Sequence, residues 1–452
     1  MYYSKYNVLM PFSDSQYKYV ILNALTGAFD LATADEGLVL EELAQGRPAK
    51  DSELKGYLLS RGYVFESKEQ EERLIQEKLV EFQDALNDSA PQVLIIPTYA
   101  CNLDCIYCFQ KGIKHKNQLI TRDTVDAFYN LLPNLYPFQK LFITLFGGEP
   151  LINSPKQREI IDYIVKKAAD LGYEIAAVTN GYDLQEYLTV LNQAKIREIQ
   201  VTIDGPSSVH DSRRHTTNGK GTYERIITGL KSAIQMGIPI NLRVVADETN
   251  FASLADLAME LDNLGWLDLP PEKFKTQIGR NYELFDCYAT PSHLLGQVEH
   301  WAKVVELSQK HPVLRKFHQP EFKGIKHLVQ TGELYLPTFD TCPACKTEWV
   351  FDLYGDIYGC TANTGRDEYK LGEFYPELKL DNEQIQNWQQ RNVLNIPECR
   401  ECDVSLICGG GCGVVAKEKN GRVLSPDCRP IKGIIGQGLE YYKTEILKIG
   451  QG

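Results

Sequence analysis

Apolar runs alternate with amphipathic stretches in the middle of the chain, between residues 92 and 287. Short runs rich in Val, Ile, Leu and Phe predict six strands, at Gln92–Tyr99, Lys140–Phe146, Glu174–Thr179, Glu198–Ile203, Ile238–Ala246 and Phe274–Ile278. The stretches between them carry apolar residues at helical spacing, at Thr121–Leu135, Gln157–Leu171, Leu184–Ala194, Tyr223–Met236 and Phe251–Leu264. Strands that alternate with helices predict an α/β fold with a parallel sheet and right-handed crossovers.

The first 90 residues follow a different pattern and are predicted to form a small separate module. Short strands are expected at Tyr6–Phe12, Tyr17–Ala24, Ala28–Ala32 and Tyr63–Phe65, and helices at Ser52–Arg61 and Lys68–Leu86. A further helix begins at a capping box of Thr33 and Glu36, and its apolar face is expected to contain Leu38, Leu40 and Leu43. The chain is thus divided into a module at 1–90, a barrel at 91–290, a bridging region at 291–340, a cysteine-rich domain at 341–430 and a C-terminal helix at 431–452.

The composition narrows the class of protein. A hydrophobic fraction of 43% and a charged fraction of 24% are those of an ordinary globular protein. A net charge of −12 argues against a nucleic-acid binder, which would present a basic face. No apolar run is long enough to span a membrane, and Met1–Ser15 lacks the pattern of a secretion signal. We therefore expect a cytoplasmic protein, in which the 12 cysteines are metal ligands rather than disulfides.

Three of these cysteines follow the first predicted strand of the barrel. Cys101, Cys105 and Cys108 have the spacing C-x3-C-x2-C. Thiolates at this spacing can hold one iron–sulfur cluster from a single loop and leave one iron open. A zinc site would need a fourth ligand nearby, and the next cysteine is Cys287, interpreted as a plain core residue. The alternative is a trio of incidental buried cysteines.

This stretch resembles the cluster motif of the radical S-adenosylmethionine (SAM) superfamily, with Tyr107 in the aromatic position before the last cysteine. The resemblance implies a partial (β/α)6 barrel, a [4Fe-4S] cluster on Cys101, Cys105 and Cys108, and SAM bound to the open iron. In such barrels the chemistry lies at the C-terminal ends of the strands.

Other motifs fall at those strand ends. The resemblance assigns the SAM amino group to Gly147-Gly148-Glu149-Pro150 and the SAM carboxylate to Arg214, in an H-D-x-x-R pattern after the fourth strand. Further candidates for the SAM pocket are Thr179, Asn180, Thr202, Asp204 and Arg243. The alternatives are ordinary turns for the glycines and small polar residues, and surface positions for Arg213, Arg214 and Arg243.

The C-terminal part contains eight cysteines: Cys342, Cys345, Cys360, Cys399, Cys402, Cys408, Cys412 and Cys428. Their spacing resembles the SPASM domain, the auxiliary-cluster tail of peptide-modifying radical SAM enzymes. The resemblance implies two [4Fe-4S] clusters, one on Cys342, Cys345, Cys360 and Cys412 and one on Cys399, Cys402, Cys408 and Cys428. Trp349–Tyr358 is predicted to be a hairpin. The alternative is a pair of zinc sites.

The strand and helix pattern of the first 90 residues resembles the winged-helix leader-recognition domain of peptide-modifying enzymes. There, a leader peptide adds as a strand to an exposed edge. The alternative is a structural cap on the barrel.

Together, these resemblances imply a maturase that abstracts hydrogen from a residue of a ribosomally made precursor peptide and installs an oxidative modification. An electron donor such as flavodoxin or ferredoxin is implied as a partner. Thr361 stands where sulfatase-maturating relatives have a basic Asp, which counts against that activity. Eight tail cysteines favour a carbon–carbon or carbon–oxygen cross-link over a thioether. The alternatives are a maturase of a folded protein or small metabolite, and a zinc-binding scaffold with a degenerate barrel.

Overall fold

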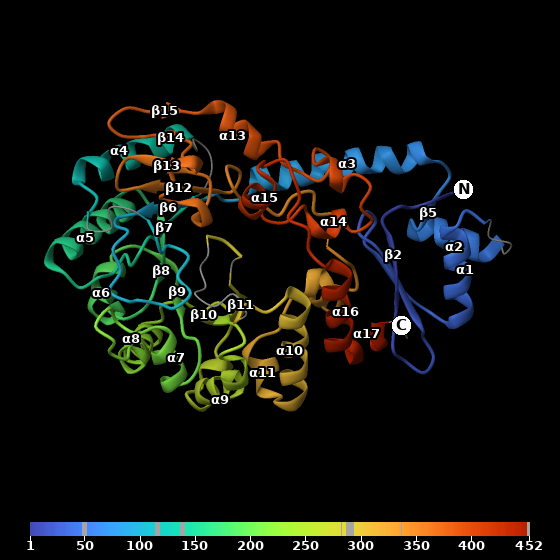
Figure 1. Ribbon diagram of the computed structural model, residues 1–452, viewed down its shortest axis with the longest axis horizontal. Coiled ribbons are helices and arrows are strands. Elements are labelled where there is room, and N and C mark those ends of the chain that lie inside the picture. The colour runs from blue at the N-terminus through green and yellow to red at the C-terminus, as the bar shows by residue number, and fades with distance from the viewer. Residues whose placement is uncertain are drawn as a thin grey trace.

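The computed structural model describes residues 1–47, 52–113, 118–135, 141–281, 283–285, 293–335 and 337–449. Cys287, interpreted above as a core cysteine, lies outside these residues. One ten-stranded sheet, in the order β11-β10-β9-β8-β7-β6-β12-β13-β14-β15, organises the molecule (Figure 1). Its first six strands are β6 (Gln92–Ile96), β7 (Phe142–Leu145), β8 (Glu174–Thr179), β9 (Ile196–Thr202), β10 (Ile240–Ala246) and β11 (Phe274–Arg280). Neighbours among these six pair in parallel, so the predicted parallel sheet is confirmed.

Helices cover the outside of this sheet (Figure 1). They are α4 (Arg122–Leu135), α5 (Pro155–Asp170), α6 (Leu184–Leu191), α7 (Ser207–Arg213), α8 (Tyr223–Gln235) and α9 (Leu254–Asn263). Each predicted helix is found within a few residues of its expected bounds, and a 3-10 turn at Phe251–Ser253 precedes α9. The short helix α7 was not predicted, because seven residues after Pro206 carry too little periodicity to be recognised.

The cysteine-rich tail is part of the same sheet, which the sequence did not predict. Strand β12 (Glu348–Asp352) pairs in parallel with β6, and β13 (Asp356–Tyr358) folds back on it as the predicted hairpin. The short strands β14 (Gly372–Glu373) and β15 (Lys379–Leu380) follow at the edge. Buried residues from both sides of the β6–β12 junction form one continuous hydrophobic core. The tail is therefore fused to the barrel rather than appended to it.

The remaining helices belong to the bridging region and the tail. They are α10 (Gln297–Lys310), α11 (Val313–Phe317), α12 (Ile325–Thr331), α13 (Asn382–Gln389), α14 (Ser405–Cys408), α15 (Gly413–Asn420), α16 (Ile431–Tyr441) and α17 (Lys443–Ile449). The prediction of one C-terminal helix is wrong, since the chain leaves helical geometry at Tyr442 and two helices result. Within the described ranges, no helix combines the length and apolar character needed to cross a membrane.

The N-terminal module has the predicted elements in the predicted order, preceded by one short strand, β1, that was not predicted. Its elements are β1 (Tyr2–Tyr3), β2 (Asn7–Pro11), β3 (Tyr19–Asn23), β4 (Ala28–Ala32), α1 (Ala34–Ala44), α2 (Ser52–Arg61), β5 (Val64–Phe65) and α3 (Lys68–Asp88). The capping box of Thr33 and Glu36 is confirmed. Leu38 was wrongly assigned to the buried face of α1: it is 55% exposed, whereas Leu40 and Leu43 are buried.

This module is not a free-standing unit. Its strands share a hydrophobic core with α12, α16 and α17. In Figure 1 the blue strands lie beside the red helices α16 and α17. Another core joins the module to the tail, where Tyr6, Phe65 and Ile75 are buried with Phe339 and Ile396. Both ends of the chain therefore pack together on one side of the barrel.

Phe351 tests how strongly the tail is fused to the barrel. Its side chain is fully buried on β12, and its ring lies 5.3 Å from those of Phe128 on α4 and Phe374. We expect Phe351→Ala to lower the free energy of unfolding by about 3–5 kcal/mol, the usual cost of such a cavity. The measurement is urea unfolding under anaerobic conditions. Leu378→Ala, at a position that is 50% exposed, is the control and should change little; equal effects would contradict the shared core.

Candidate cofactor site

The cysteine loop leaves the C-terminal end of β6 and is held by the segment after β9. The backbone N–H of Asp104 donates to the carbonyl of His215 (2.9 Å), and that of Ile106 donates to the carbonyl of Arg213 (3.1 Å). These bonds fix the loop around Cys105 over the sheet end. The structure therefore places the three cysteines where the chemistry of a partial barrel is expected.

The three thiols lie close enough to influence one another's ionisation. Desolvation, the charge of Glu149 and the thiolates of Cys105 and Cys108 together raise the pKa of Cys101 to about 12. Burial raises the pKa of Cys105, whereas the cation of Arg214 lowers it. Within the described residues, no three Cys, His, Asp or Glu side chains are placed to hold a single metal ion. In a four-iron cluster each thiolate binds a different iron atom.

The structure explains why positions 147 and 148 are glycines, which the sequence alone did not. The N–H of Gly148 donates to the carbonyl of Thr98 (3.0 Å), and that of Glu149 donates to the carbonyl of Ala100 (2.7 Å). A Cβ at Gly147 or Gly148 would lie 2.4 or 2.2 Å from those carbonyl oxygens. Glycine is therefore required here because the loop packs directly against the cysteine loop.

Glu149 lies behind the cavity wall rather than on it. Its carboxylate accepts hydrogen bonds from Thr179 Oγ1 (2.6 Å) and from the backbone N–H groups of Asn180 (2.6 Å) and Leu151 (2.8 Å). Burial raises its pKa to about 7, and the three bonds oppose that shift. Glu149 thereby joins the end of β7 to the end of β8, and in the structure it faces the protein rather than a ligand.

A cavity of about 300 Å³ opens beside the three cysteines. The predicted site residues that line it are Cys101, Cys105, Tyr107, Cys108, Gly147, Gly148, Thr179, Asn180, Thr202, Arg214 and Arg243. Glu149, Pro150 and Asp204, which were predicted to bind the cofactor, are not among its lining residues. The sequence analysis missed Phe109, Gln110, Gln200, Asn281, Glu348 and Thr361, which also line it.

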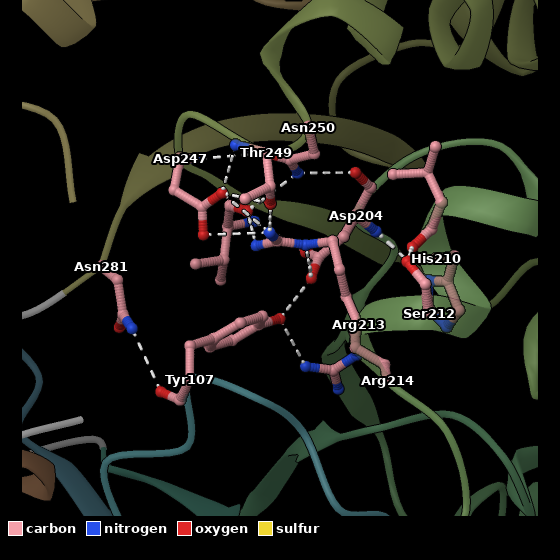
Figure 2. A network of polar contacts seen from close by, with 12 residues as sticks. Tyr107, Asp204, His210, Ser212, Arg213, Arg214, Asp247, Thr249, Asn250 and Asn281 are labelled. Carbon is pink, nitrogen blue, oxygen red and sulfur yellow. Dashed lines mark hydrogen bonds and ion pairs between the residues drawn. The ribbon is translucent and has the colours of Figure 1, made fainter. Parts of the chain in front are cut away.

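Tyr107 organises one wall of the cavity (Figure 2). Its hydroxyl donates to Asp204 Oδ2 (2.5 Å) and accepts from Arg214 Nη1 (2.8 Å), while Asn281 Nδ2 donates to its carbonyl (3.1 Å). The Nε of Arg214 is buried and has no partner in the described part of the chain. A buried N–H without an acceptor is costly, so this group fits an anionic ligand in the cavity.

The neighbouring Arg213 has a different environment. Its guanidinium lies 3.2 Å from Asp204 and 2.8 Å from Asp247, and all three side chains are almost fully buried. It also donates to the carbonyl of Val245 (3.0 Å). The surface alternative is therefore wrong for both arginines, and only Arg214 reaches the cavity.

The first two residues of the H-D-x-x-R pattern support the loop rather than a ligand. His210 Nδ1 accepts from the Asp204 N–H (3.2 Å), and its Nε2 lies 3.1 Å from Thr222 Oγ1, which donates to the carbonyl of Arg214 (2.6 Å). Burial lowers the pKa of His210 to about 4, so its ring is neutral. Asp211 accepts from the N–H groups at the start of α8.

The tail cysteines fall into two groups that match the predicted sets. A Cβ at Gly359 would lie 2.9 Å from Cys345 Sγ, and one at Gly413 would lie 3.1 Å from Cys342 Sγ. Gly359 directly precedes Cys360, and Gly413 directly follows Cys412. The chain at Cys360 therefore lies close to the thiol of Cys345, and the chain at Cys412 lies close to the thiol of Cys342. Burial is the main cause of the raised pKa of Cys360, and the charges of Glu348, Cys342 and Cys412 raise it further.

The second group is gathered by a run of three glycines. Gly409, Gly410 and Gly411 all have positive φ, between 62° and 73°. Gly410 accepts from the Asp427 N–H (2.9 Å), which brings the segment before Cys428 next to Cys408. Burial is the main cause of the raised pKa of Cys399, and the charges of Cys408, Cys402 and Cys428 raise it further.

An unpartnered amide near the first group supports the fit of a cluster. Both polar side-chain atoms of Asn363 are buried without a partner in the described residues, three positions after Cys360. Hydrogen bonds from such groups to cluster sulfides are a common way to tune iron–sulfur centres.

Comparisons with known proteins agree with this geometry. Residues 95–261 match the model of the Radical SAM superfamily. The fold and the cavity thus agree with a radical SAM domain over residues 95–261, which is followed by a cysteine-rich C-terminal region.

Individual proteins are similar to the chain at low sequence identity. The chain is 28% identical over 173 residues to a probable GTP 3′,8-cyclase of Saccharolobus islandicus (strain L.S.2.15 / Lassen #1), which covers 37% of this chain and 52% of that one. It thus spans about half the length of such relatives. It is 26% identical over 349 residues to the mycofactocin maturase MftC of Mycobacterium tuberculosis (strain CDC 1551 / Oshkosh), covering 74% and 81%.

Solved structures show the same fold. Native anSMEcpe with bound AdoMet and Cp18Cys peptide matches with a TM-score of 0.59 and 16% identity, over 80% of this chain and 99% of that one. Streptococcus suis SuiB bound to precursor peptide SuiA matches with a TM-score of 0.54 and 14% identity, over 95% and 99%.

Asp352 gives a pH-dependent test of the link between the cysteine loop and the tail. It is fully buried at the end of β12 and accepts from Tyr99 Oη (3.0 Å), just before the cysteine loop. Burial, with the charge of Asp356, raises its pKa from 3.8 to about 7. Its stabilising contribution is therefore complete below about pH 4 and is lost as the pH rises to about 7.

We expect the wild type to lose about 2–3 kcal/mol more unfolding free energy between pH 5 and pH 8 than Asp352→Asn, by the usual conversion of pKa to energy. Urea unfolding at several pH values measures this difference. The exposed Asp381→Asn is the control, and parallel pH profiles for wild type and Asp352→Asn would contradict the assignment.

Proposed function

We propose that the chain is a cytoplasmic maturase that installs an oxidative modification, most readily an intramolecular cross-link, in a ribosomally made precursor peptide. One observation carries the proposal: a single cavity brings together three thiols and the buried, unpartnered Nε of Arg214. Cys101, Cys105 and Cys108 would hold a [4Fe-4S] cluster whose open iron binds SAM. When bound, SAM and this cluster supply a carbon radical that removes hydrogen from the substrate.

The protein residues would orient SAM and exclude water. Arg214 would bind the SAM carboxylate, since no described residue accepts from its Nε and its Nη1 is already fixed by Tyr107. Asn180 and Thr202 add polar groups to the same wall. Gln110 lines the cavity, and its buried Nε2 has no partner among the residues that the structure describes, so it would donate a further hydrogen bond to the cofactor. Glu149 would keep the ends of β7 and β8 in place behind this wall.

The two tail groups would hold auxiliary [4Fe-4S] clusters that accept the electron released by the substrate. Four thiols gather in the first group, Cys342, Cys345, Cys360 and Cys412. If all four bind, no iron stays open for a substrate thiol. This supports a carbon–carbon or carbon–oxygen link over a thioether. A flavodoxin or ferredoxin would supply the reducing electron.

A second, larger cavity supports a peptide substrate. It measures about 930 Å³, runs along the edge strand β11 and is lined by Arg243, which also lines the cysteine cavity. The smaller cavity of about 300 Å³ has little room for a peptide beside SAM. The peptide would therefore lie along β11 and present one residue at Arg243.

Two other functions have some support. The similarity to proteins named as probable GTP 3′,8-cyclases favours a small-metabolite substrate, but that alignment covers 52% of the relative, whereas the alignment to a maturase covers 81%. A zinc-binding scaffold would use the same tail thiols. Metal analysis separates the scaffold from the enzyme.

We expect anaerobically purified protein to contain about twelve irons, and the triple variant of Cys101, Cys105 and Cys108 to Ala about eight, since one four-iron cluster is lost. The variant should no longer cleave SAM to 5′-deoxyadenosine. Iron content, absorbance near 400 nm and chromatography of the products provide the measurement. SAM cleavage by the triple variant would refute the assigned site, and zinc in place of iron would favour the scaffold.

The N-terminal module is proposed to bind the leader of the precursor peptide by strand addition, because β2 and β4 are the edges of its three-stranded sheet. The test is hydrogen exchange of the loaded full chain with the peptide encoded beside its gene. We expect the complete peptide to slow exchange within residues 2–32. A peptide with a scrambled leader should leave exchange in these residues unchanged. Unchanged exchange at both β2 and β4 would remove this part of the proposal.

A further inference from the structure

Glu348 is the one carboxylate among the described residues that line the cysteine cavity, and no His or Lys lines it there. Its position follows from the pairing of the tail with the barrel. Glu348 is in register with Gln92, the first residue of β6, whereas the cysteines follow the last residue of that strand. Glu348 therefore lies at the end of the cavity opposite the thiols.

One neighbouring segment holds this carboxylate in place. The backbone N–H of Thr361 donates to Glu348 Oε1 (2.6 Å), and Thr361 also lines the cavity. Thr361 directly follows Cys360, so this end of the cavity is next to the first auxiliary group. A substrate residue between Glu348 and the three cysteines of the loop would thus lie between the proposed SAM-binding cluster and the proposed first auxiliary cluster.

The balance of donors and acceptors on the lining is uneven. Arg214, Gln110 and Arg243 offer N–H donors, and the side-chain amides of Asn180 and Gln200 can serve as either. Among the described lining residues, Glu348 alone has a carboxylate. Thr361 donates to its Oε1. A partly desolvated carboxylate gains most from a further charge-assisted hydrogen bond.

We propose that Glu348 is a substrate-binding residue whose carboxylate accepts a hydrogen bond from an N–H or O–H group on the side chain that is modified. This rests on the proposed function and narrows it. The modified residue carries a polar donor, with a cationic side chain bound most tightly, and purely hydrocarbon side chains are not held at this end of the cavity. Arg243 lies on β10, across the cavity from β12, so a donor and an acceptor face the substrate from opposite walls.

The test uses two small probes of nearly equal shape, N-acetyl-lysine methylamide and N-acetyl-norleucine methylamide, which differ in the ammonium group. Their affinities for the anaerobically loaded full chain with SAM are measured by ligand-observed NMR. For the wild type we expect the lysine probe to bind about tenfold or more tightly than the norleucine probe, because only the lysine probe has a side-chain donor for the carboxylate.

In Glu348→Gln the preference for the lysine probe should fall about tenfold, while the affinity of the norleucine probe stays within about twofold. Gln keeps the acceptor for the Thr361 N–H, so the local structure should persist. Glu377→Gln, an exposed carboxylate of the tail, is the matched control and should behave as the wild type. Iron content and circular dichroism establish that each variant is folded and loaded.

Three results would overturn the inference: no preference for the lysine probe in the wild type, equal loss of both probes in Glu348→Gln, or the same change in Glu377→Gln. The failure of the proposed function looks different. In that case the wild type would not form 5′-deoxyadenosine from SAM at all, whereas failure of the inference alone would leave this cleavage by the wild type intact.

Discussion

The parallel pairing of β12 with β6 is the interaction on which the rest of the structure depends. It places the tail hairpin on the first strand of the barrel, in register from Glu348 beside Gln92 to Asp352 beside Ile96. The cysteine loop leaves the end of β6, and Cys360 follows the end of the hairpin. One set of backbone hydrogen bonds therefore positions both the three-cysteine loop and the first group of tail cysteines.

Buried titratable groups then hold the loops at the strand ends. Glu149 joins the ends of β7 and β8, Arg213 joins Asp204 to Asp247, and Asp352 holds Tyr99. Buried ion pairs add little to net stability, but they define one arrangement because each unpaired alternative would be costly. They leave Arg214, whose Nε is unpartnered, facing the cavity. The protein thus keeps most buried charges for its own loops and directs a few toward the ligand.

The N-terminal module and the C-terminal helices would form the frame for the proposed peptide. Their shared core attaches the three-stranded sheet firmly to the side of the molecule. A leader bound at an edge of that sheet would be held at a fixed distance from the cavity. The groove along β11 and the cavity at Arg243 would then receive the segment that follows it, which gives the enzyme a physical reason for both a module and a groove.

The sequence by itself determined the parallel strands and the helices between them, and it predicted which thiols bind metal, because these depend on local periodicity and on short spacings. It also identified Arg214 and Tyr107 through motifs in single loops. It could not determine that the tail continues the barrel sheet, since pairing between residues some 250 positions apart leaves no local pattern. For the same reason it did not predict that Glu348 and Gln110 line the cavity or that Glu149 and Asp204 lie outside its lining, and it placed the exposed Leu38 in a core. Which side of a residue faces a cavity is decided by the packing of distant segments, and only the tertiary structure contains that information.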